Sequence, residues 1–295
     1  PTIARDDALD VHVLTTGLMA EGIDLGSPSI RRIEPIKPLM LVGRGVSATA
    51  AGEVWHLLDT RVAVPLTMVD VERLDGIDLG DYTHLILVNG DYKRIADKQT
   101  ERIRDWVSRG GVLVATQKGA KWVTDKGLHV KKKDETEAEE DTEASEAEEE
   151  PKDEDRFRPY ASFRDDRSKR RISGAIFRIH LDNTHPIGYG YAATTLPVFR
   201  NGTVFIEPSE NPCETVGRYT DDPLIAGYLS DERRDELAGS AAIVAERRGR
   251  GVVIRMADNP NFRGVWYGTN KLYLNALYFG RLIDSTRLDA ERIEE

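Results

Sequence analysis

Cysteine is almost absent from this sequence: Cys213 is the only one among 295 residues. A single cysteine can form no disulfide within the chain and no cysteine-based zinc cluster. A chain of this length buries a core large enough to fold without such cross-links. The scarcity of cysteine therefore excludes a disulfide-stapled fold, but it does not fix the compartment.

Long apolar runs and zinc-binding motifs are also missing. No stretch of about 18 apolar residues occurs, so the sequence predicts no membrane span. None of the six histidines stands in an H-E-x-x-H or H-x-x-E motif. His180 and His185 are the closest pair, but Asn183 and Pro186 disfavour a helix that would bring them together. We expect no metal site and no cofactor within this chain.

The negative charge is confined to one segment. The whole chain has a net charge of -10, yet residues 134–155 alone hold 14 acidic residues and one lysine. The rest has 37 acidic and 40 basic residues and is close to neutral. Without aromatic or branched aliphatic residues, the segment cannot offset its chain entropy, so we expect a disordered, solvated insertion. Binding of a cation or a basic partner is the alternative. No basic stripe with interleaved aromatics indicates nucleic acid.

The chain divides into four parts by composition. Residues 1–36, rich in Gly, Ser and Pro, are interpreted as a lead-in from a preceding domain. Residues 37–283 form one α/β domain, interrupted by an acidic insertion at 131–158, and residues 284–295 form a tail. Because the sequence begins at Pro1 without methionine, we interpret it as a piece of a longer or processed protein.

The first half alternates short apolar runs with helical patterns, which predicts a parallel sheet covered on both faces. Asp97 is expected to cap the second helix and Gly110 to end it with a positive φ. The expected strands are Pro38–Gly43, 64–71, 83–90 and 111–116, and the expected helices begin at Ala50 and Asp97.

The second half is richer in strand patterns. Residues 172–182, 194–200 and 203–208 are each expected to form a strand. Residues 240–258 predict a hairpin turned at Gly249–Gly251, and residues 269–283 predict a terminal helix with Leu272, Ala276 and Phe279 on one face.

A weak dinucleotide fingerprint follows the first strand. Gly43, Gly45 and Ala48 give G-x-G-x-x-A, and Asp70 ends the next strand. Glycine after a parallel strand is ordinary in such folds, so a structural turn is the favoured interpretation.

Two residues are candidate nucleophiles. Thr116 lies at a strand-to-helix turn, the place where α/β enzymes present a reactive side chain. Cys213 lies in a polar turn. A nucleophile needs a neighbouring base, and His129 is the histidine nearest to Thr116 in sequence. We expect no catalytic residue in this chain.

The segment from Asp258 onward is dense in Asn, Arg and aromatic residues directly after a strand. Loops at the carboxyl ends of strands are where open α/β sheets bind ligands. Packing of Phe262 and Trp266 against their own sheet is the favoured alternative. The expected ligand cleft comprises Gly43, Arg44, Asn89, Thr116, Gln117, Asn259, Arg263 and Trp266.

Two stretches together carry a family resemblance. The pattern from PLMLVG to GGVLVATQKG and the stretch DPLIAGYLSDERRDELAGSAAIVAERRGRGVVIRMADNPNFRGVWYGTNKLYLNALYFG resemble the C-terminal region of bacterial zinc carboxypeptidases of the M14 type. In that family a class I glutamine amidotransferase-like domain follows the peptidase domain. The resemblance implies a three-layer, flavodoxin-like α/β fold with a mostly parallel sheet and antiparallel additions.

The same resemblance implies a function without catalysis in this chain. The family's zinc-binding H-x-x-E is absent, so zinc is expected in an upstream peptidase domain. Amidotransferases place cysteine in G-x-C-x-G, where this chain has Ala115-Thr116-Gln117-Lys118-Gly119. We expect a non-catalytic accessory domain of a secreted or periplasmic zinc metallocarboxypeptidase. Its own peptidase domain is the expected partner, and a second copy of the chain is a further candidate. The alternatives are a small-ligand or carbohydrate-binding module and a hydrolase using Thr116 or Cys213.

Overall fold

The computed structural model describes residues 10, 12–129, 160, 169 and 172–284. The chain forms two compact units, Pro1–Glu34 and Pro35–Glu295. The acidic insertion expected at 131–158 and nearly all of the tail expected at 284–295 lie outside the described residues. No helix in the described part of the chain is long and apolar enough to span a membrane.

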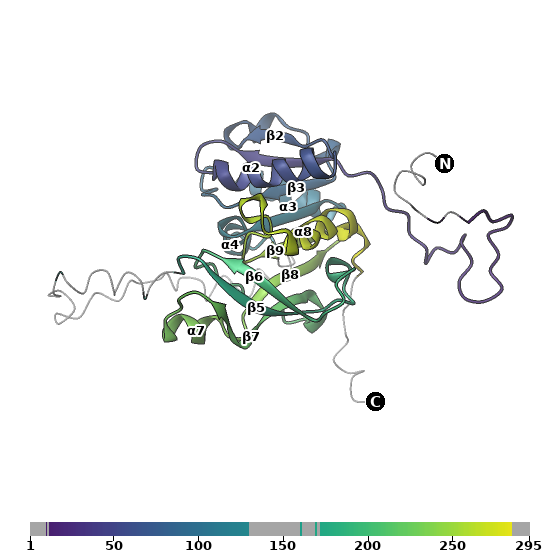
Figure 1. Cartoon of the computed structure of the whole chain (residues 1–295). Helices are drawn as coiled ribbons and strands as arrows, with labels where there is room; N and C mark the ends of the chain where they lie inside the picture. The colour runs from purple at the N-terminus through teal and green to yellow at the C-terminus, as the bar shows by residue number, and fades with distance from the viewer. Residues whose placement is uncertain (1–9, 11, 130–159, 161–168, 170–171, 285–295) are drawn as a thin grey trace. The chain divides into compact units, whose positions relative to one another are not determined.

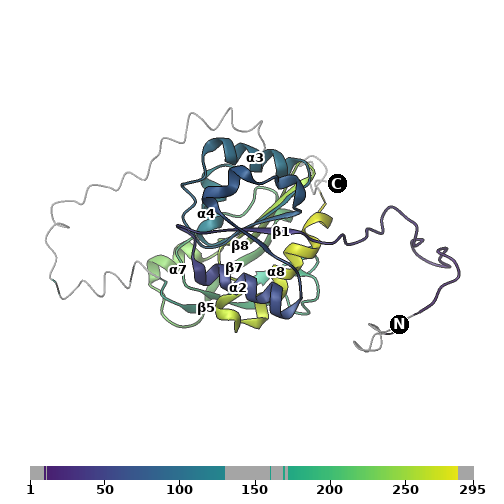
Figure 2. The ribbon, with the colours of Figure 1, turned by 90° about the horizontal axis from the view of Figure 1, so that it is seen from above.

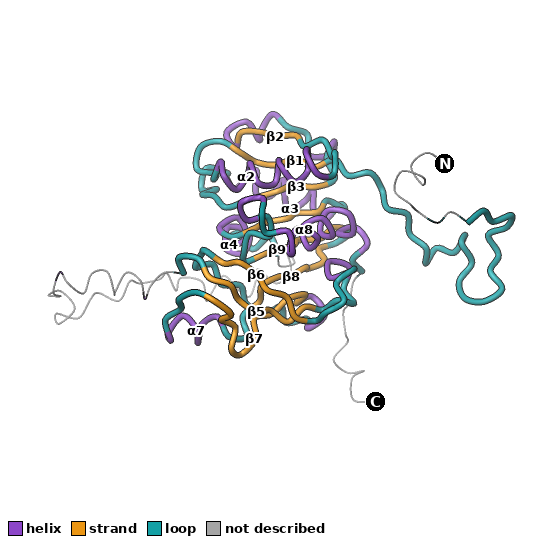
Figure 3. The backbone as a smooth tube through the Cα atoms, viewed as in Figure 1, coloured by secondary structure: helices purple, strands orange, loops and turns teal. Residues whose placement is uncertain are grey.

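The second unit is built on a nine-stranded sheet in the order β2-β1-β3-β4-β9-β8-β7-β5-β6 (Figures 1 and 3). The first five strands in this order are parallel and the remaining four are antiparallel. The parallel part has the 2-1-3-4-5 order of flavodoxin-like sheets. Its strands are β1 (Pro38–Val42), β2 (Thr67–Asp70), β3 (His84–Leu87), β4 (Val112–Thr116) and β9 (Gly251–Met256).

Helices cover both faces of the parallel strands, so the fold is the expected three-layer α/β arrangement (Figure 2). One face packs against α2 (Ala48–His56) and α8 (Tyr267–Phe279). The other packs against α3 (Asp97–Ser108) and α4 (Lys118–Asp125). The central strands β3 and β4 are buried along their whole length, as near-continuous apolar runs between two helical layers require.

Local sequence signals explain most element boundaries. Ser47 caps α2 by accepting a hydrogen bond from the Ala50 amide, and Gly110 has the expected positive φ of 123°. The prediction that Asp97 caps α3 is wrong, because Ala96 holds that position and Asp97 is the first helical residue. The Asp97 carboxylate instead accepts a hydrogen bond from Lys126 at 2.9 Å.

The antiparallel additions are β5 (Ala175–Leu181), β6 (Thr195–Arg200), β7 (Thr215–Ala226) and β8 (Ala241–Arg248). The predicted hairpin is confirmed as β8 and β9. The prediction of a strand at 203–208 is wrong, because that segment makes only an isolated β-bridge, between Ile206 and Ala241. Neither β7 nor the short helix α7 (Asp231–Leu237) was expected from the sequence.

Candidate functional site: the carboxyl ends of the parallel strands

The loops after β1 and β3 meet where the strand order reverses, which is where open α/β sheets bind ligands. Here the two loops bond directly to each other. The Ser47 amide donates to the Asn89 carbonyl at 2.9 Å, and the Asp91 amide donates to the Gly45 carbonyl at 2.9 Å. The Ser47 and Asp91 amides are therefore engaged between the loops rather than free to bind a phosphate.

Gly43 serves protein packing in the same way. A Cβ atom at Gly43 would collide with the carboxylate of Asp70, which stands at the end of β2. The Asp70 carboxylate also accepts a hydrogen bond from the Glu72 amide at 2.8 Å. Gly43 and Asp70, two of the four residues that suggested a dinucleotide fingerprint, thus contact each other. Arg44, between the loop glycines, is exposed.

The turn after β4 is a sharp strand-to-helix turn, the β4–α4 elbow, with Gln117 at its tip. Gln117 has φ 50° and ψ -124°, a strained backbone conformation for a residue with a side chain. The Gln117 amide donates to the Met256 carbonyl at 2.9 Å, which joins the elbow to β9. Gly119 makes the sharp turn possible, because a Cβ there would come within 2.6 Å of the Leu87 carbonyl oxygen.

The Gln117 side chain is buried and engaged rather than presented to solvent. Its Nε2 donates to Oδ1 of Asn201 at 2.9 Å. Gly202 also lies over the amide, since a Cβ at that glycine would be 3.7 Å from Gln117 Nε2. The loop after β6 therefore covers the elbow. Thr116 is the last residue of β4 and is also buried.

The loop after β9 is held by a buried carboxylate on α2. Glu53 accepts hydrogen bonds from the Asn259 side-chain amide and, at 2.6 Å, from the backbone amide of Arg263. Arg263 has a positive φ of 52°, and its side chain is exposed. The Asn259 Oδ1 accepts a hydrogen bond from the Asn261 amide at 2.9 Å. Both hydrogen-bonding atoms of the Asn259 side chain thus position the loop.

Aromatic rings gather beside this loop. Phe262 stacks on Phe199 of β6 with ring centroids 3.8 Å apart, and Trp266 lies 6.1 Å from Phe199. The Arg263 guanidinium lies 5.2 Å from the Phe262 ring centroid, within cation–π range. Phe262 and Trp266 are partly buried, so the loop both packs on its own sheet and leaves some aromatic surface exposed.

A buried polar cluster lies on the β6 side of the same loop. Arg200 donates to Tyr219 Oη and to Asp258 Oδ1, each at 3.0 Å, and Tyr219 donates to the other oxygen of Asp258. Burial raises the pKa of both Asp258 and Tyr219, while the Arg200 charge opposes the rise. A buried carboxylate persists where a cation and hydrogen bonds compensate it, so this cluster fixes the start of the loop.

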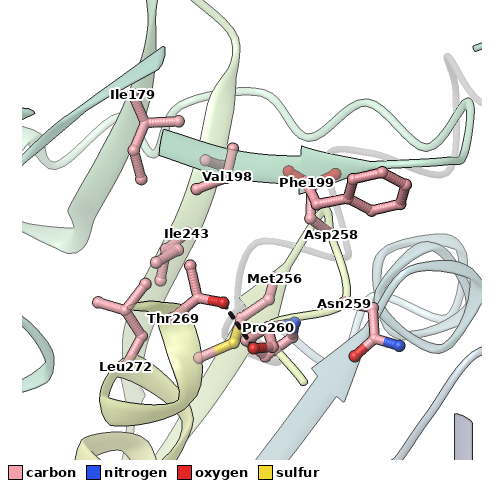
Figure 4. A pocket seen from close by; sticks show the side chains of 11 residues that line it. Ile179, Val198, Phe199, Ile243, Met256, Asp258, Asn259, Pro260, Thr269 and Leu272 are labelled. Atoms are coloured by element: carbon pink, nitrogen blue, oxygen red, sulfur yellow. Dashed lines mark hydrogen bonds between the residues drawn. The ribbon is translucent and has the colours of Figure 1, made fainter. Parts of the chain in front are cut away.

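A small pocket opens between this cluster and α8 (Figure 4). Its volume of about 20 Å³ is enough for roughly one water molecule. The hydroxyl of Thr269 donates to the Pro260 carbonyl at its edge. The lining is mostly apolar: Ile179, Val198, Phe199, Ala242, Ile243, Met256, Asp258, Asn259, Pro260, Thr269 and Leu272.

The remaining candidate chemical groups do not converge on the elbow. Cys213 is exposed in a short 3-10 turn. His185 is buried, and its Nδ1 accepts a hydrogen bond from the Ile187 amide at 3.1 Å. Burial lowers the pKa of His185 to about 4. In the part of the chain that the structure describes, no three His, Cys, Asp or Glu residues form a group that could hold a metal ion.

The structure thus separates the expected cleft residues by role. Gln117, Asn259 and Arg263 lie in the turns after the adjacent strands β4 and β9, whereas Gly43 and Asn89 belong to the closed switch-point loops. Sequence reasoning missed Glu53, Asn201 and the Arg200–Tyr219–Asp258 cluster. Only Glu53 gave a signal in the sequence. It lies on an otherwise apolar helix face, and a buried carboxylate requires hydrogen-bonding partners.

Comparisons with solved structures find similar folds. A ThuA-like protein from Parabacteroides merdae has a TM-score of 0.49 and 10% identity, covering 84% of this chain and 90% of its own. A ThuA-like protein from Bacteroides uniformis has a TM-score of 0.46 and 10% identity, covering 85% and 94%. A GMP synthase-like protein from Thermoplasma acidophilum has a TM-score of 0.42 and 11% identity, covering 82% and 92%.

These likenesses say what the chain resembles in fold and carry nothing about its activity. No protein-family model matches the chain. No curated protein matches its sequence.

Proposed function

We propose that this chain is a non-catalytic accessory domain of a zinc metallocarboxypeptidase, which it helps to assemble or to position for its substrate. The observation that carries the non-catalytic part is the hydrogen bond between Gln117 and Asn201. A carboxamide is no nucleophile, and here the amide is buried and covered by the loop after β6. The scaffold of an amidotransferase-type enzyme is kept while its reactive position has a packing role.

The peptidase parent is supported by the sequence resemblance described above. Zinc and the catalytic groups would belong to the partner domain, whose substrate is the C-terminal residue of a peptide. This chain would contact the folded peptidase domain. It would either stabilise that domain or help to place the peptide substrate in it.

The test combines two measurements. The purified chain with zinc and a peptide carrying a free C-terminus should give no hydrolysis. Added to a purified M14-type zinc carboxypeptidase domain, the chain should raise that domain's melting temperature or lower its KM. Turnover by the chain alone would contradict the non-catalytic assignment, and an unchanged peptidase would contradict the accessory role.

A second candidate function is binding of a small polar ligand or a carbohydrate. The arrangement that favours it is the partly exposed ring of Phe262 with the Arg263 guanidinium at the strand ends. A ligand at 100 times its Kd adds about 2.7 kcal/mol to stability, so a thermal-shift screen of sugars and nucleotides is the measurement. A true ligand should lose its effect in Phe262→Ala and keep it in Tyr228→Ala, which removes an exposed aromatic elsewhere.

A further inference from the structure

Two Asn-Gly pairs occur in the sequence, and the fold places them in contrasting surroundings. They are Asn89–Gly90 after β3 and Asn201–Gly202 after β6. In such a pair the backbone amide nitrogen of glycine can attack the side-chain carbonyl carbon of asparagine, because glycine has no Cβ to shield that nitrogen. The attack closes a succinimide ring. How readily the ring closes depends on the room and the hydrogen bonds around each pair.

The pair after β3 is fixed within the closed switch-point loops. Gly90 is buried and forms an isolated β-bridge with Val46. The Asn89 carbonyl accepts a hydrogen bond from the Ser47 amide at 2.9 Å, and a Cβ atom at Gly90 would lie only 2.9 Å from Val46 Cα. The peptide between Asn89 and Gly90 therefore has little room to turn toward the Asn89 side chain.

The pair after β6 is open to attack. Asn201 is exposed, and Gly202 is partly exposed in a segment without regular secondary structure. The Gly202 amide donates no backbone hydrogen bond within the described part of the chain. Beyond its chain neighbours, a Cβ atom at Gly202 would meet only Gln117 Nε2 among the described residues, at 3.7 Å. The Gly202 nitrogen is thus unshielded.

Gln117 provides a hydrogen bond at the atom where charge develops. Its Nε2 donates to Asn201 Oδ1 at 2.9 Å. When the Gly202 nitrogen bonds to Asn201 Cγ, this oxygen becomes negatively charged, and a positioned donor stabilises such an oxyanion. The donor is held in place, because Gln117 is buried and its backbone amide is bonded to the Met256 carbonyl. The structure therefore brings the nucleophile, the carbonyl and an oxyanion donor together.

We propose that Asn201 is a site of self-modification, in which Gly202 attacks the Asn201 side chain and Gln117 stabilises the oxyanion. The Gly202 nitrogen bonds to Asn201 Cγ, the Cγ–Nδ2 bond breaks, and ammonia leaves with the proton of the Gly202 amide. Water then opens the succinimide ring and leaves aspartate or isoaspartate at position 201. Isoaspartate adds a methylene group to the backbone and so displaces the loop that covers the elbow. The proposal goes beyond the accessory function and needs no partner domain.

The test follows deamidation by mass spectrometry of proteolytic peptides, after the whole chain has been incubated in mildly alkaline, oxygen-labelled water. Wild type is compared with Gly202→Ala and Gln117→Leu, and Asn89 is the internal control in every sample. Gly202→Ala makes no close contact and shields the nitrogen. Gln117→Leu removes the donor and keeps a side chain of similar size. Hydrogen exchange of the β4 amides shows that each variant is folded.

We expect Asn201 to deamidate at least about tenfold faster than Asn89 in the folded chain, and each substitution to slow Asn201 by about tenfold while Asn89 is unchanged. In urea the two pairs should react at similar rates. Equal rates at the two sites in the folded wild type would overturn the proposal. A fast reaction at Asn201 that Gln117→Leu leaves unchanged would also overturn it, as would a difference between the sites that persists in urea.

Discussion

Gln117 and Asn201 lie 84 residues apart in the sequence, and their side-chain amides are joined by a hydrogen bond of 2.9 Å. This bond connects the tip of the β4–α4 turn to the loop after β6, so the antiparallel extension of the sheet covers this turn. The arrangement makes the elbow a structural joint.

Replacing Gln117 tests the strain at the elbow. Gln117→Gly removes the steric penalty of its φ and ψ angles, about 1–3 kcal/mol, and loses a hydrogen bond contributing about 1 kcal/mol. We expect its free energy of unfolding to stay within about 1 kcal/mol of wild type in urea titrations. Gln117→Val combines a β-branched side chain with positive φ and should cost more than about 2 kcal/mol. A glycine variant as unstable as the valine variant would contradict the prediction.

The Glu53 carboxylate is expected to hold the loop after β9. Glu53→Ala leaves the Arg263 amide and the Asn259 side chain without their acceptor, and an unsatisfied buried donor costs about 1–3 kcal/mol. Hydrogen exchange of the Arg263 amide should accelerate by at least about tenfold while the amides of β4 stay protected. Glu53→Gln keeps one acceptor and should have a smaller effect. Unchanged exchange at Arg263 in Glu53→Ala would show that other contacts hold the loop.

The Arg200–Tyr219–Asp258 cluster is expected to contribute strongly to the free energy of unfolding. Asp258→Asn removes the charge that compensates the buried Arg200, and breaking such a pair costs about 3–5 kcal/mol. The control Asp221→Asn alters an exposed carboxylate of β7 and should stay within about 0.5 kcal/mol of wild type. Chemical denaturation at pH 7 measures both, and similar values for the two variants would refute the assignment.

The stability of the fold is expected to decrease in mild acid because of His84. Burial, together with the Arg281 charge, lowers the pKa of His84 to about 3, against about 6.5 in the unfolded chain. Below pH 6.5 the unfolded state therefore binds a proton that the folded state does not. The contribution of neutral His84 to the free energy of unfolding is fully present above pH 6.5. It falls by about 2 kcal/mol between pH 7 and pH 5.

The His84→Gln variant provides the comparison. The substitution removes the titrating group at a fully buried position, so the variant can be less stable overall. Its free energy of unfolding should nevertheless change less with pH than that of wild type over this range. Parallel pH profiles for the two proteins would mean that His84 does not contribute the predicted term.

The cysteine is expected to react as an ordinary surface thiol. Cys213 is exposed, so iodoacetamide should label one site per chain at the rate of a free cysteine in a denatured peptide. Thr116 is buried and should not react with fluorophosphonate or lactone probes. Labelling of Cys213 that is about 100-fold faster than in the denatured peptide, or any labelling of Thr116, would support the hydrolase alternative. The variant Cys213→Ser shows whether Cys213 is the labelled residue.

The sequence by itself determined the parallel half of the fold. Continuous apolar runs such as Val112–Thr116 can only be buried between two layers of helices, and glycines at helix ends place the turns. The arrangement of the second half was less accessible, since β7 (Thr215–Ala226) carries charged residues and pairs irregularly with its neighbours. Exposed antiparallel strands have a weaker pattern than buried parallel ones.

The roles of individual site residues were decided by tertiary structure alone. The sequence pointed to Thr116 as the residue at the strand-to-helix turn, whereas the structure puts Gln117 at the tip of that turn. The partner of Gln117, Asn201, comes from a loop after β6 that no local pattern connects to it. Likewise Glu53 is paired with Asn259 and Arg263 from more than 200 residues away. Hydrogen bonds between distant segments depend on how the sheet is ordered, and periodicity and turn chemistry act only over a few residues.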